Sequence, residues 1–280
     1  MPPYNFSTLT VEISPAGVAH VQLNRPKALN AFSNQMWEDI HACFSQMKTD
    51  SDVRCAVVSG SGRIFTAGLD LKDAVQNPTF SGKHDESADV ARKGYYHRFH
   101  IHHWQDCLSA MERCDKPVIA AVHNACFGAG VDFITGCDIR LATEDAYFCV
   151  KEVDIGMAAD VGTLQRLPKV VGNDSWVREV CYTARQVPAK EALAVGLISG
   201  VYKTKEEMVK AALVMAETIA SKSPVAVVST KHLLNHARDH TVQEGLEYTA
   251  LWNALAHNSK DMGVAMMASL QKQKATFPKL

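Results

Sequence analysis

The segment G-A-G-V-D-F-I-T-G-C, residues 128–137, is an apolar run that carries a single charge, Asp132. If the run is a helix, apolar side chains surround this carboxylate, and a buried ionised acid is costly unless it is paired or used in chemistry. The segments K-E-V-D-I-G-M-A-A-D (151–160) and V-G-T-L-Q-R (161–166) follow it and carry further acids. We therefore expect the chain to be organised around residues 128–166.

The beginning of this run offers a binding site for a developing negative charge. Gly128 and Gly130 let another molecule approach the backbone closely. A helix N-terminus presents unpaired N–H groups at the positive end of its dipole. Ala129 stands three residues before Asp132, so the two share one helical face. One face would therefore offer a donor to an oxyanion and, one turn further, a carboxylate, which suits proton transfer next to a carbonyl group.

Composition excludes several classes of protein. With 280 residues and 47% hydrophobic content, the chain can bury a large core as one domain, or as one domain with an appendage. Its 29 basic and 30 acidic residues give a formal net charge of −1, which argues against a nucleic-acid partner. No apolar run approaches the roughly 20 residues of a membrane span, so we expect no membrane insertion.

The cysteines and the first residues indicate where the protein works. Eight cysteines include no C-x-x-C pair, and most stand in apolar runs. This pattern predicts reduced thiols in the core and a reducing compartment. The opening residues M-P-P-Y-N-F have neither the charge and apolar stretch of a signal peptide nor an Arg-rich presequence.

The part of the chain before residue 118 alternates strand and helix patterns. Apolar and polar residues alternate around a Pro-Ala-Gly turn, and later apolar residues recur at helical spacing after Ser33, a good N-cap. The expected elements are a hairpin of 8–14 and 17–23, a helix from Ser33, a buried strand at 53–59, a polar loop at 73–88 and a helix over 89–114.

From residue 118 the mixed pattern continues and then becomes helical near residue 205. The expected strands are 118–122, 139–142, 147–150 and 197–202, and the expected helices are 175–183, 189–195, 205–221, 224–236, 241–257 and 259–275. The alternation favours stacked β-β-α units, but periodicity alone does not distinguish these from a doubly wound sheet. We place the boundary between a core of residues 1–204 and a helical region of residues 205–280.

A histidine cluster lies in the helix expected over 89–114. Its residues are His97, His100, His102 and His103, and we find no Cys or acidic partner at helical ligand spacing. A partly solvated helix surface is therefore favoured over a metal site, and we expect no metal.

Three motifs together resemble the crotonase (enoyl-CoA hydratase/isomerase) superfamily. They are L-N-R-P-K-A-L-N-A-F (23–32), G-R-I-F-T-A-G-L-D-L (62–71) and the stretch 126–166. The resemblance implies an α/β fold, the crotonase (ClpP-like) spiral of β-β-α units with a C-terminal helical trimerisation region. It also implies a homo-oligomer, either a trimer or a dimer of trimers. The implied substrate is an acyl-coenzyme A thioester, so no separate cofactor is expected.

The resemblance also assigns residues around the thioester. The two N–H groups of the family's oxyanion hole would belong to Leu69 and Ala129. Lys272, in K-Q-K-A-T-F (272–277), matches a lysine that reaches the 3′-phosphate bound by a neighbouring subunit. The implied substrate- and coenzyme A-binding residues are Lys27, Ala28, Ala67, Gly68, Leu69, Asp70, Leu71 and Lys272.

The acids favour one branch of the superfamily. Asp132 and Glu152 are twenty residues apart, as are the two acids of the hydratases, and Asp160 stands where hydratases commonly have glycine. The run 151–172 resembles the dienoyl-CoA isomerase branch, which converts 3,5-dienoyl-CoA to 2,4-dienoyl-CoA in the β-oxidation of unsaturated fatty acids. Implied roles are a base at C2 for Glu152, an acid at C6 for Asp160 and electrostatic tuning for Asp132. Because the reaction is reversible, which acid serves which carbon stays open.

The sequence leaves other functions open for the protein, and it leaves structural roles open for its acidic residues. The alternatives are a 2-enoyl-CoA hydratase and a non-catalytic, RNA-binding or scaffolding family member. Asp160 could instead cap a helix that starts at Val161. Glu152 could be an exposed strand residue. Asp138 and Arg140, two apart on a strand, are expected to form a structural ion pair.

The sequence ends in F-P-K-L, and its last two residues match the peroxisomal S-K-L signal. Pro278 replaces the serine, favours extended backbone and removes a donor. Together with acyl-CoA chemistry, Pro278-Lys279-Leu280 favours a peroxisome-like organelle, with the cytoplasm and then the mitochondrion as alternatives.

Overall fold

The structure is a computed structural model that describes residues 4–76 and 88–280. Most of the loop expected at 73–88 therefore lies outside the described residues. Its first residues belong instead to the short helix α2 (Leu71–Ala74), which Asp70 caps by accepting a hydrogen bond from the N–H of Asp73.

The first sheet has six strands, and all but the first pair are parallel. β1 (Leu9–Ile13) and β2 (Val18–Leu23) form the predicted antiparallel hairpin. The order is β1-β2-β3-β4-β6-β9, where the later strands are β3 (Cys55–Gly60), β4 (Val118–Val122), β6 (Ile139–Thr143) and β9 (Gly200–Tyr202). Every residue of β3 and β4 is buried, as expected for parallel strands covered on both faces.

A second, smaller sheet turns the chain into a spiral. It contains β5 (Ala125–Phe127), β7 (Tyr147–Cys149) and β8 (Val187–Pro188). The chain runs from β4 to β5 and into α5 (Ala129–Thr135), then from β6 to β7 and into the 3-10 helix η2 (Glu152–Ile155). Each turn thus places one strand in each sheet before a helix. The predicted β-β-α spiral is confirmed, and the doubly wound alternative is wrong.

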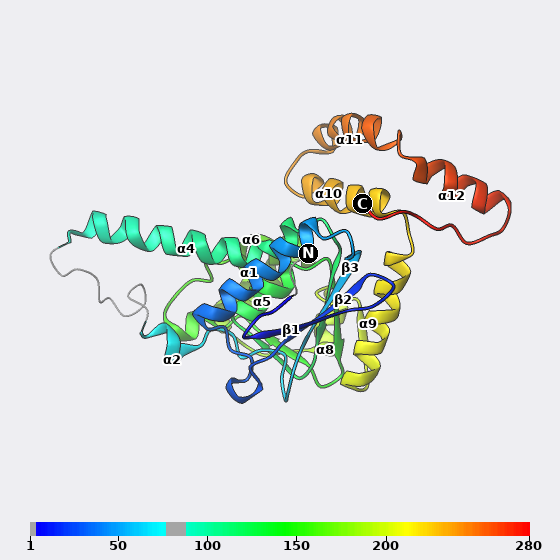
Figure 1. Cartoon of the computed structure of the whole chain (residues 1–280). Coiled ribbons are helices and arrows are strands. Elements are labelled where there is room, and N and C mark those ends of the chain that lie inside the picture. The colour runs from blue at the N-terminus through cyan, green and yellow to red at the C-terminus, as the bar shows by residue number, and fades with distance from the viewer. Residues whose placement is uncertain (1–3, 77–87) are drawn as a thin grey trace.

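Helices cover the two faces of the first sheet (Figure 1). α1 (Asn34–Thr49) and α4 (Val90–Arg113) lie where the helical spacing predicted them, and Ser33 caps α1. Ala56 and Val58 of β3 belong to the core cluster under these helices. Cys55 and Val57, which point to the other face, pack with α9 (Lys205–Ala220). This alternation follows from the two-residue repeat of a strand.

Four further segments precede the C-terminal region: η1 (Pro26–Ala28), α6 (Thr163–Val171), α7 (Asp174–Thr183) and α8 (Ala189–Ala194). The sequence patterns had predicted α7 and α8. Gly196 follows α8 with a φ of 82°, a left-handed value that favours glycine after a helix.

The C-terminal helices are α10 (Pro224–Ala237), α11 (Val242–Ala256) and α12 (Lys260–Leu270). In Figure 1 they project from the body of the spiral, whereas α9 lies along the sheet. The helical pattern does begin at residue 205, but its first helix packs with the core. The division into 1–204 and 205–280 stays a prediction.

The last helix is shorter than the predicted 259–275. Lys272 adopts a left-handed φ of 55° and its N–H donates to the carbonyl of Ser269, while the N–H of Gln273 donates to the carbonyl of Ala268. These two bonds form a Schellman motif, which closes a helix by satisfying its last carbonyl groups. Lys272 therefore follows the helix rather than lying on it.

Apolar residues of the C-terminal region divide into two groups. Leu213, Met215 and Ile219 of α9 pack against the buried cluster under that helix. The others remain largely exposed, and this group comprises Leu246, Leu251, Leu255, Met266 and Met267. Such a concentration on α11 and α12 marks a surface suited to association.

Among the described residues no single helix is long and apolar enough to span a membrane. α9 and α10 pass that test only as a pair, and they are bent by 109° relative to each other.

Candidate active site

A mainly apolar cavity of about 180 Å³ lies at the meeting point of the segments 67–71, 128–129 and 151–161 with α1 and α4. Half of the predicted site residues line it: Ala67, Leu69, Leu71, Ala129, Glu152 and Asp160. These six residues come from two of the three motifs, 62–71 and 126–166, which the fold brings together.

Leu69 pairs with Phe32 in an isolated β-bridge that does not use the N–H group of Leu69. Phe32 donates to the carbonyl of Gly68 at 2.7 Å and accepts from the N–H of Asp70 at 3.1 Å. These two bonds flank Leu69 and do not include its N–H group. Within the described residues its N–H donates no hydrogen bond, so it is free to bind an oxygen in the cavity.

Ala129 supplies the second N–H group because it is the first residue of α5. Gly128 before it has a φ of 49°, and within the described chain the N–H of Ala129 also has no acceptor. A Cβ added to Gly68 would stand 2.6 Å from the Phe127 carbonyl oxygen and 3.5 Å from the Ala129 nitrogen. The backbones that carry the two N–H groups are therefore in contact, as an oxyanion hole requires.

Glu152 is the first residue of η2 and is 9% exposed. Burial, followed by the charge of Asp132, raises the pKa of this carboxyl to about 7. Its Oε2 atom has no hydrogen-bond partner among the described residues. The alternative of an exposed strand residue is wrong, and the side chain is suited to exchange a proton near neutral pH.

Asp160 is half-buried, and burial raises its pKa above the ordinary value. It does not cap a helix, since Gly162 is the N-cap of α6 and the helix begins at Thr163. The helix-capping alternative is therefore wrong. Asp160 instead lines the cavity together with Glu152, and its main-chain oxygen accepts a hydrogen bond from Gln105 at 2.7 Å.

Asp132 lies behind the cavity wall rather than in it. It is 0% exposed, its Oδ1 accepts a hydrogen bond from the N–H of Thr163 at 2.5 Å, and its Oδ2 has no described partner. Burial raises its pKa to about 6. Ala129 on the same short helix does line the cavity. Asp132 would therefore act through its charge, which raises the pKa of Glu152.

Replacement of Asp132 by asparagine tests this position. The folded pKa of Asp132 lies above its ordinary value of 3.8, so its ionisation costs stability as pH rises from about 4 to about 6. The Asp132→Asn variant has no charge to form. We expect its Tm relative to wild type to rise over that pH range, measured by thermal denaturation. A Tm difference that does not vary with pH would contradict burial of an ionising Asp132. Turnover should fall less than in Glu152→Gln.

The remaining predicted binding residues lie outside the cavity. Asp70 forms an ion pair with Arg25 at 2.9 Å, and Gly68 packs behind the cavity. Lys27 and Ala28 belong to η1, where Lys27 is exposed. Lys272 follows α12, at the opposite end of the molecule from α2 in Figure 1. Within one chain, Lys272 therefore does not reach the cavity.

Two tryptophans of the cavity wall were missed. Trp37 of α1 and Trp104 of α4 line the cavity with ring centroids 6.3 Å apart. Neither was singled out in the sequence, because periodicity does not separate a core residue from one that borders a cavity.

The histidine cluster contains a partner that the sequence interpretation overlooked. Cys107 stands four residues after His103, and its Sγ lies 3.9 Å from His103 Nε2, which is also 2.5 Å from Glu38 Oε1. The statement that no cysteine has helical ligand spacing is therefore wrong. Burial raises the pKa of Cys107 to about 12, which disfavours the thiolate that binds metals.

The expected ion pair between Asp138 and Arg140 is also wrong. Asp138 Oδ2 contacts Lys231 Nζ at 2.8 Å, and Lys231 comes from α10. Arg140 donates to the main-chain oxygens of Cys137 and Leu197, each at 2.7 Å. Asp138 is thus paired with a lysine distant in sequence, and Arg140 is satisfied by main-chain oxygens rather than by a carboxylate. All eight cysteines are buried and free, as predicted.

The β-β-α spiral indicates the crotonase class of proteins. So does a cavity that brings Glu152 and Asp160 together with two N–H groups that have no acceptor among the described residues. The family model described as Enoyl-CoA hydratase/isomerase matches residues 14–279, and the chain belongs to this family. It is 48% identical over 282 residues to a human protein named Delta(3,5)-Delta(2,4)-dienoyl-CoA isomerase, mitochondrial, covering 100% of this chain and 85% of that protein.

A second relative and a solved structure agree with this assignment. An Arabidopsis thaliana protein named Delta(3,5)-Delta(2,4)-dienoyl-CoA isomerase, peroxisomal, is 40% identical over 265 residues, covering 95% of this chain and 94% of that protein. The crystal structure of an enoyl-CoA hydratase from Bacillus anthracis superposes with a TM-score of 0.86 at 24% identity, covering 97% and 99% of the two chains. This last likeness confirms the crotonase fold.

Proposed function

We propose that this protein is an isomerase that converts 3,5-dienoyl-CoA to 2,4-dienoyl-CoA in the β-oxidation of unsaturated fatty acids. The observation that carries the proposal is the presence of two acids, Glu152 and Asp160, on the wall of one apolar cavity that also contains the N–H groups of Leu69 and Ala129. The two relatives named as dienoyl-CoA isomerases match nearly the whole chain and support it.

The geometry suggests how the reaction proceeds. The thioester oxygen would accept hydrogen bonds from Leu69 and Ala129, which stabilise the dienolate formed when C2 loses a proton. Glu152, whose pKa is about 7, would take that proton as a carboxylate. Charge then extends along the conjugated chain to C6, where Asp160 would deliver a proton. The substrate loses one proton and gains one, so no redox cofactor or metal ion is required.

The electrostatics supply one acid and one base in the same cavity. Three carboxyls near each other in an apolar setting do not all ionise at neutral pH. Burial raises the pKa of Asp132, Glu152 and Asp160 alike. The charge of Asp160 further raises the pKa of Asp132, and the charges of Asp132 and Asp160 further raise that of Glu152. A protonated acid beside an ionised base is the state that a proton transfer from C2 to C6 needs.

The decisive experiment compares two substrates. The protein is incubated with a 3,5-dienoyl-CoA and, separately, with a 2-enoyl-CoA, and the products are separated and identified by mass spectrometry and ultraviolet absorbance. A 2,4-dienoyl-CoA product supports the proposal. Formation of a 3-hydroxyacyl-CoA from the second substrate, without isomerisation of the first, would establish the hydratase alternative, and no reaction with either would favour a non-catalytic role.

The cavity itself weighs against the hydratase alternative. A hydratase holds a water molecule between two acids, and those acids would be Asp132 and Glu152 by their spacing. Asp132 is fully buried behind the wall, and Asp160 lines the cavity instead. The acids that face the substrate space are therefore Glu152 and Asp160, the pair expected of the isomerase.

We propose a homo-oligomer, a trimer or a dimer of trimers, built through the C-terminal helices. Leu246, Leu251 and Leu255 of α11 are 60%, 72% and 80% exposed, which is unfavourable unless another surface covers them. Light scattering at micromolar concentration should give a mass of three or six times 30.7 kDa. A monomer would contradict the proposal. In such an assembly Lys272 could bind the 3′-phosphate of a substrate held by a neighbouring subunit.

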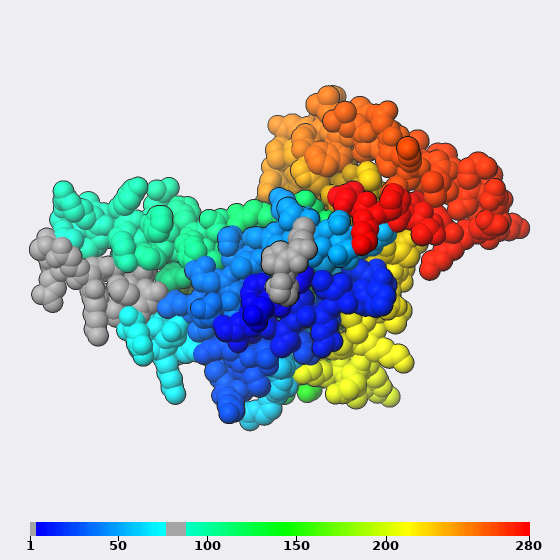
Figure 2. All heavy atoms as spheres, viewed as in Figure 1, coloured from blue at the N-terminus to red at the C-terminus, as the bar shows by residue number. Residues whose placement is uncertain are grey.

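We propose a peroxisome-like organelle as the location, with the cytoplasm and the mitochondrion as alternatives. Support comes from Pro278-Lys279-Leu280 at the end of the printed sequence and from the relative named peroxisomal. This tail lies against the first part of the chain (Figure 2), where Lys279 pairs with Asp52 and Arg54 donates to the Phe277 carbonyl at 2.8 Å. A receptor would have to displace these exposed contacts.

Localisation is tested with a fluorescent protein fused to the N-terminus. The full chain and a chain without its last three residues are expressed and imaged with peroxisomal and mitochondrial markers. We expect the full chain to coincide with the peroxisomal marker and the shortened chain to spread through the cytoplasm. Identical distributions would show that the tail is not a targeting signal.

A further inference from the structure

One face of α4 contacts the segment that carries Asp160. Gln105, Ser109 and Glu112 are spaced four and three residues apart, so they lie along one side of the helix. Gln105 Nε2 donates to the main-chain oxygen of Asp160 at 2.7 Å, and Arg166 Nη2 donates to Ser109 Oγ at 2.8 Å. The segment 160–166 is thus attached to α4 at both ends.

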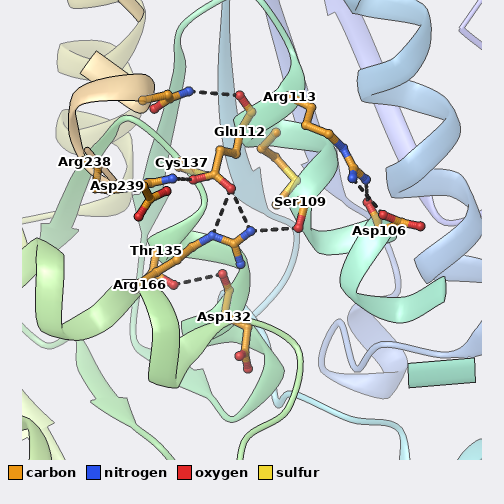
Figure 3. Close-up of polar contacts among 12 residues, drawn as sticks. Asp106, Ser109, Glu112, Arg113, Asp132, Thr135, Cys137, Arg166, Arg238 and Asp239 are labelled. Atoms are coloured by element: carbon orange, nitrogen blue, oxygen red, sulfur yellow. Dashed lines mark hydrogen bonds and ion pairs between the residues drawn. The ribbon is translucent and has the colours of Figure 1, made fainter. Parts of the chain in front are cut away.

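Glu112 joins this segment to the C-terminal helices (Figure 3). Its Oε2 accepts from Arg166 Nη2 at 2.8 Å and from Arg166 Nε at 3.2 Å, and its Oε1 pairs with Arg238, which follows α10. Burial alone would raise the pKa of Glu112, but the hydrogen bonds and charges of Arg166 and Arg238 hold it below its ordinary value. The carboxylate stays ionised and bridges both guanidinium groups.

Arg166 in turn fixes the backbone that holds the catalytic acids. Its guanidinium occupies the space beside Gly162, where an added Cβ would lie 1.9 Å from Nη1. The next residue, Thr163, donates its N–H to Asp132. Val161 borders the active-site cavity on one side and, on the other, a polar cleft of about 340 Å³ that Glu112 and Arg166 line. The segment that carries Asp160 therefore separates the active-site cavity from the polar cleft, and Glu112 and Arg166 lie on its cleft side.

We propose that Glu112 is a positioning residue for the reaction. It holds Arg166, and Arg166 in turn holds the segment 160–163, which places Asp160 and contacts Asp132. Glu112 also ties this segment to Arg238. The proposal rests on the proposed function, since it concerns the same acids. A consequence is that the C-terminal helices, which the assembly would cover, set the geometry of the active site.

The first test replaces, one at a time, the two partners of the Glu112–Arg166 ion pair. Glu112→Gln keeps the size of the side chain and removes its charge, and we expect kcat for 3,5-dienoyl-CoA to fall by ~10-fold with KM nearly unchanged. Arg166→Gln should lower kcat at least as much. It should also move the acidic limb of the pH–rate profile to lower pH, because loss of the Arg166 charge raises the pKa of Asp132, and a protonated Asp132 no longer raises the pKa of Glu152. Arg166→Lys keeps the charge and should leave that limb in place.

The matched control lies on the same helix. Arg113 contacts Asp106 Oδ1 at 2.7 Å and lies on the other side of α4 in Figure 3, away from Arg166. Arg113→Gln should therefore leave kcat and the pH profile unchanged. If Arg166→Gln gives the same kcat within about twofold and the same profile as this control, the positioning role is wrong. A purely structural role would lower Tm and active fraction while leaving the acidic limb in place.

The link to α10 is tested by a double-mutant cycle. Arg238→Gln should lower kcat by a smaller factor than Glu112→Gln, and the double variant should match Glu112→Gln alone, because both changes break one bridge. Losses that multiply would overturn the link.

Amide exchange separates this proposal from the proposed function. Hydrogen–deuterium exchange of a peptide spanning 160–166 should be faster in Glu112→Gln than in wild type and in Arg113→Gln, with no substrate present. Unchanged exchange would overturn the positioning role even in an active enzyme. Failure of the wild type to isomerise 3,5-dienoyl-CoA would instead overturn only the proposed function.

Discussion

Glu152→Gln is expected to lower kcat for 3,5-dienoyl-CoA by ~10² or more, the usual contribution of one positioned base. Glutamine has nearly the same size, so it fits the same space. That space is tight, because a Cβ added to Gly128 would lie 3.2 Å from Glu152 Oε1. The amide cannot accept the C2 proton. Steady-state turnover measures the loss, and a variant with near-wild-type kcat would remove Glu152 from the mechanism.

Stability provides the control for that variant. Burial and the neighbouring acids raise the folded pKa of Glu152 from its ordinary value of 4.5 to about 7, so its ionisation costs stability as pH rises across this interval. Glutamine does not ionise. The Tm of Glu152→Gln at pH ~8 should therefore equal or exceed that of wild type. An inactive variant with a clearly lower Tm would indicate misfolding rather than loss of a base.

The same shift predicts the pH dependence of the wild type. kcat/KM should rise as the pH increases through about 7, because the base must be deprotonated before it can accept the C2 proton, and the acid cluster loses a proton in this range. In Glu152→Gln the rise near neutral pH should disappear from the remaining activity.

Local patterns predicted most of the fold because local interactions form it. The helix after Ser33 has a cap and apolar residues at helical spacing, and α1 has that cap and those buried residues. The end of α12 was missed because Lys272 adopts a left-handed conformation that is uncommon for lysine. Asp138 was assigned to Arg140 because spacing shows which residues share a strand, whereas its partner Lys231 is 93 residues away.

The candidate site was predicted in part for the same reason. The motifs that resemble the family identified Leu69, Ala129, Glu152 and Asp160, which line one cavity. Neither spacing nor resemblance could separate Asp132, which lies behind the wall, from the acids that face the substrate space. That distinction depends on how α5 packs under the segment after η2, a contact between residues far apart in the chain.

Asp160→Asn is the second change with a large expected effect. It should lower isomerisation by ~10² or more, because asparagine does not deliver a proton to C6 at a useful rate. The fold should be unchanged, since the contact of residue 160 with Gln105 uses the main-chain oxygen and not the carboxylate. Near-wild-type turnover would exclude Asp160 as the acid.

Solvent exchange separates the roles of Glu152 and Asp160. In deuterated water, Asp160→Asn keeps the base and the oxyanion hole, so the dienolate should form and take deuterium back at C2 without moving the double bonds. Glu152→Gln should lose this exchange together with isomerisation, because the C2 proton is not removed. If Asp160→Asn abolishes exchange while Glu152→Gln retains it, Asp160 is the group at C2 and the two roles are reversed. Mass spectrometry of recovered 3,5-dienoyl-CoA distinguishes these outcomes, because deuterium taken up at C2 raises the mass of the substrate.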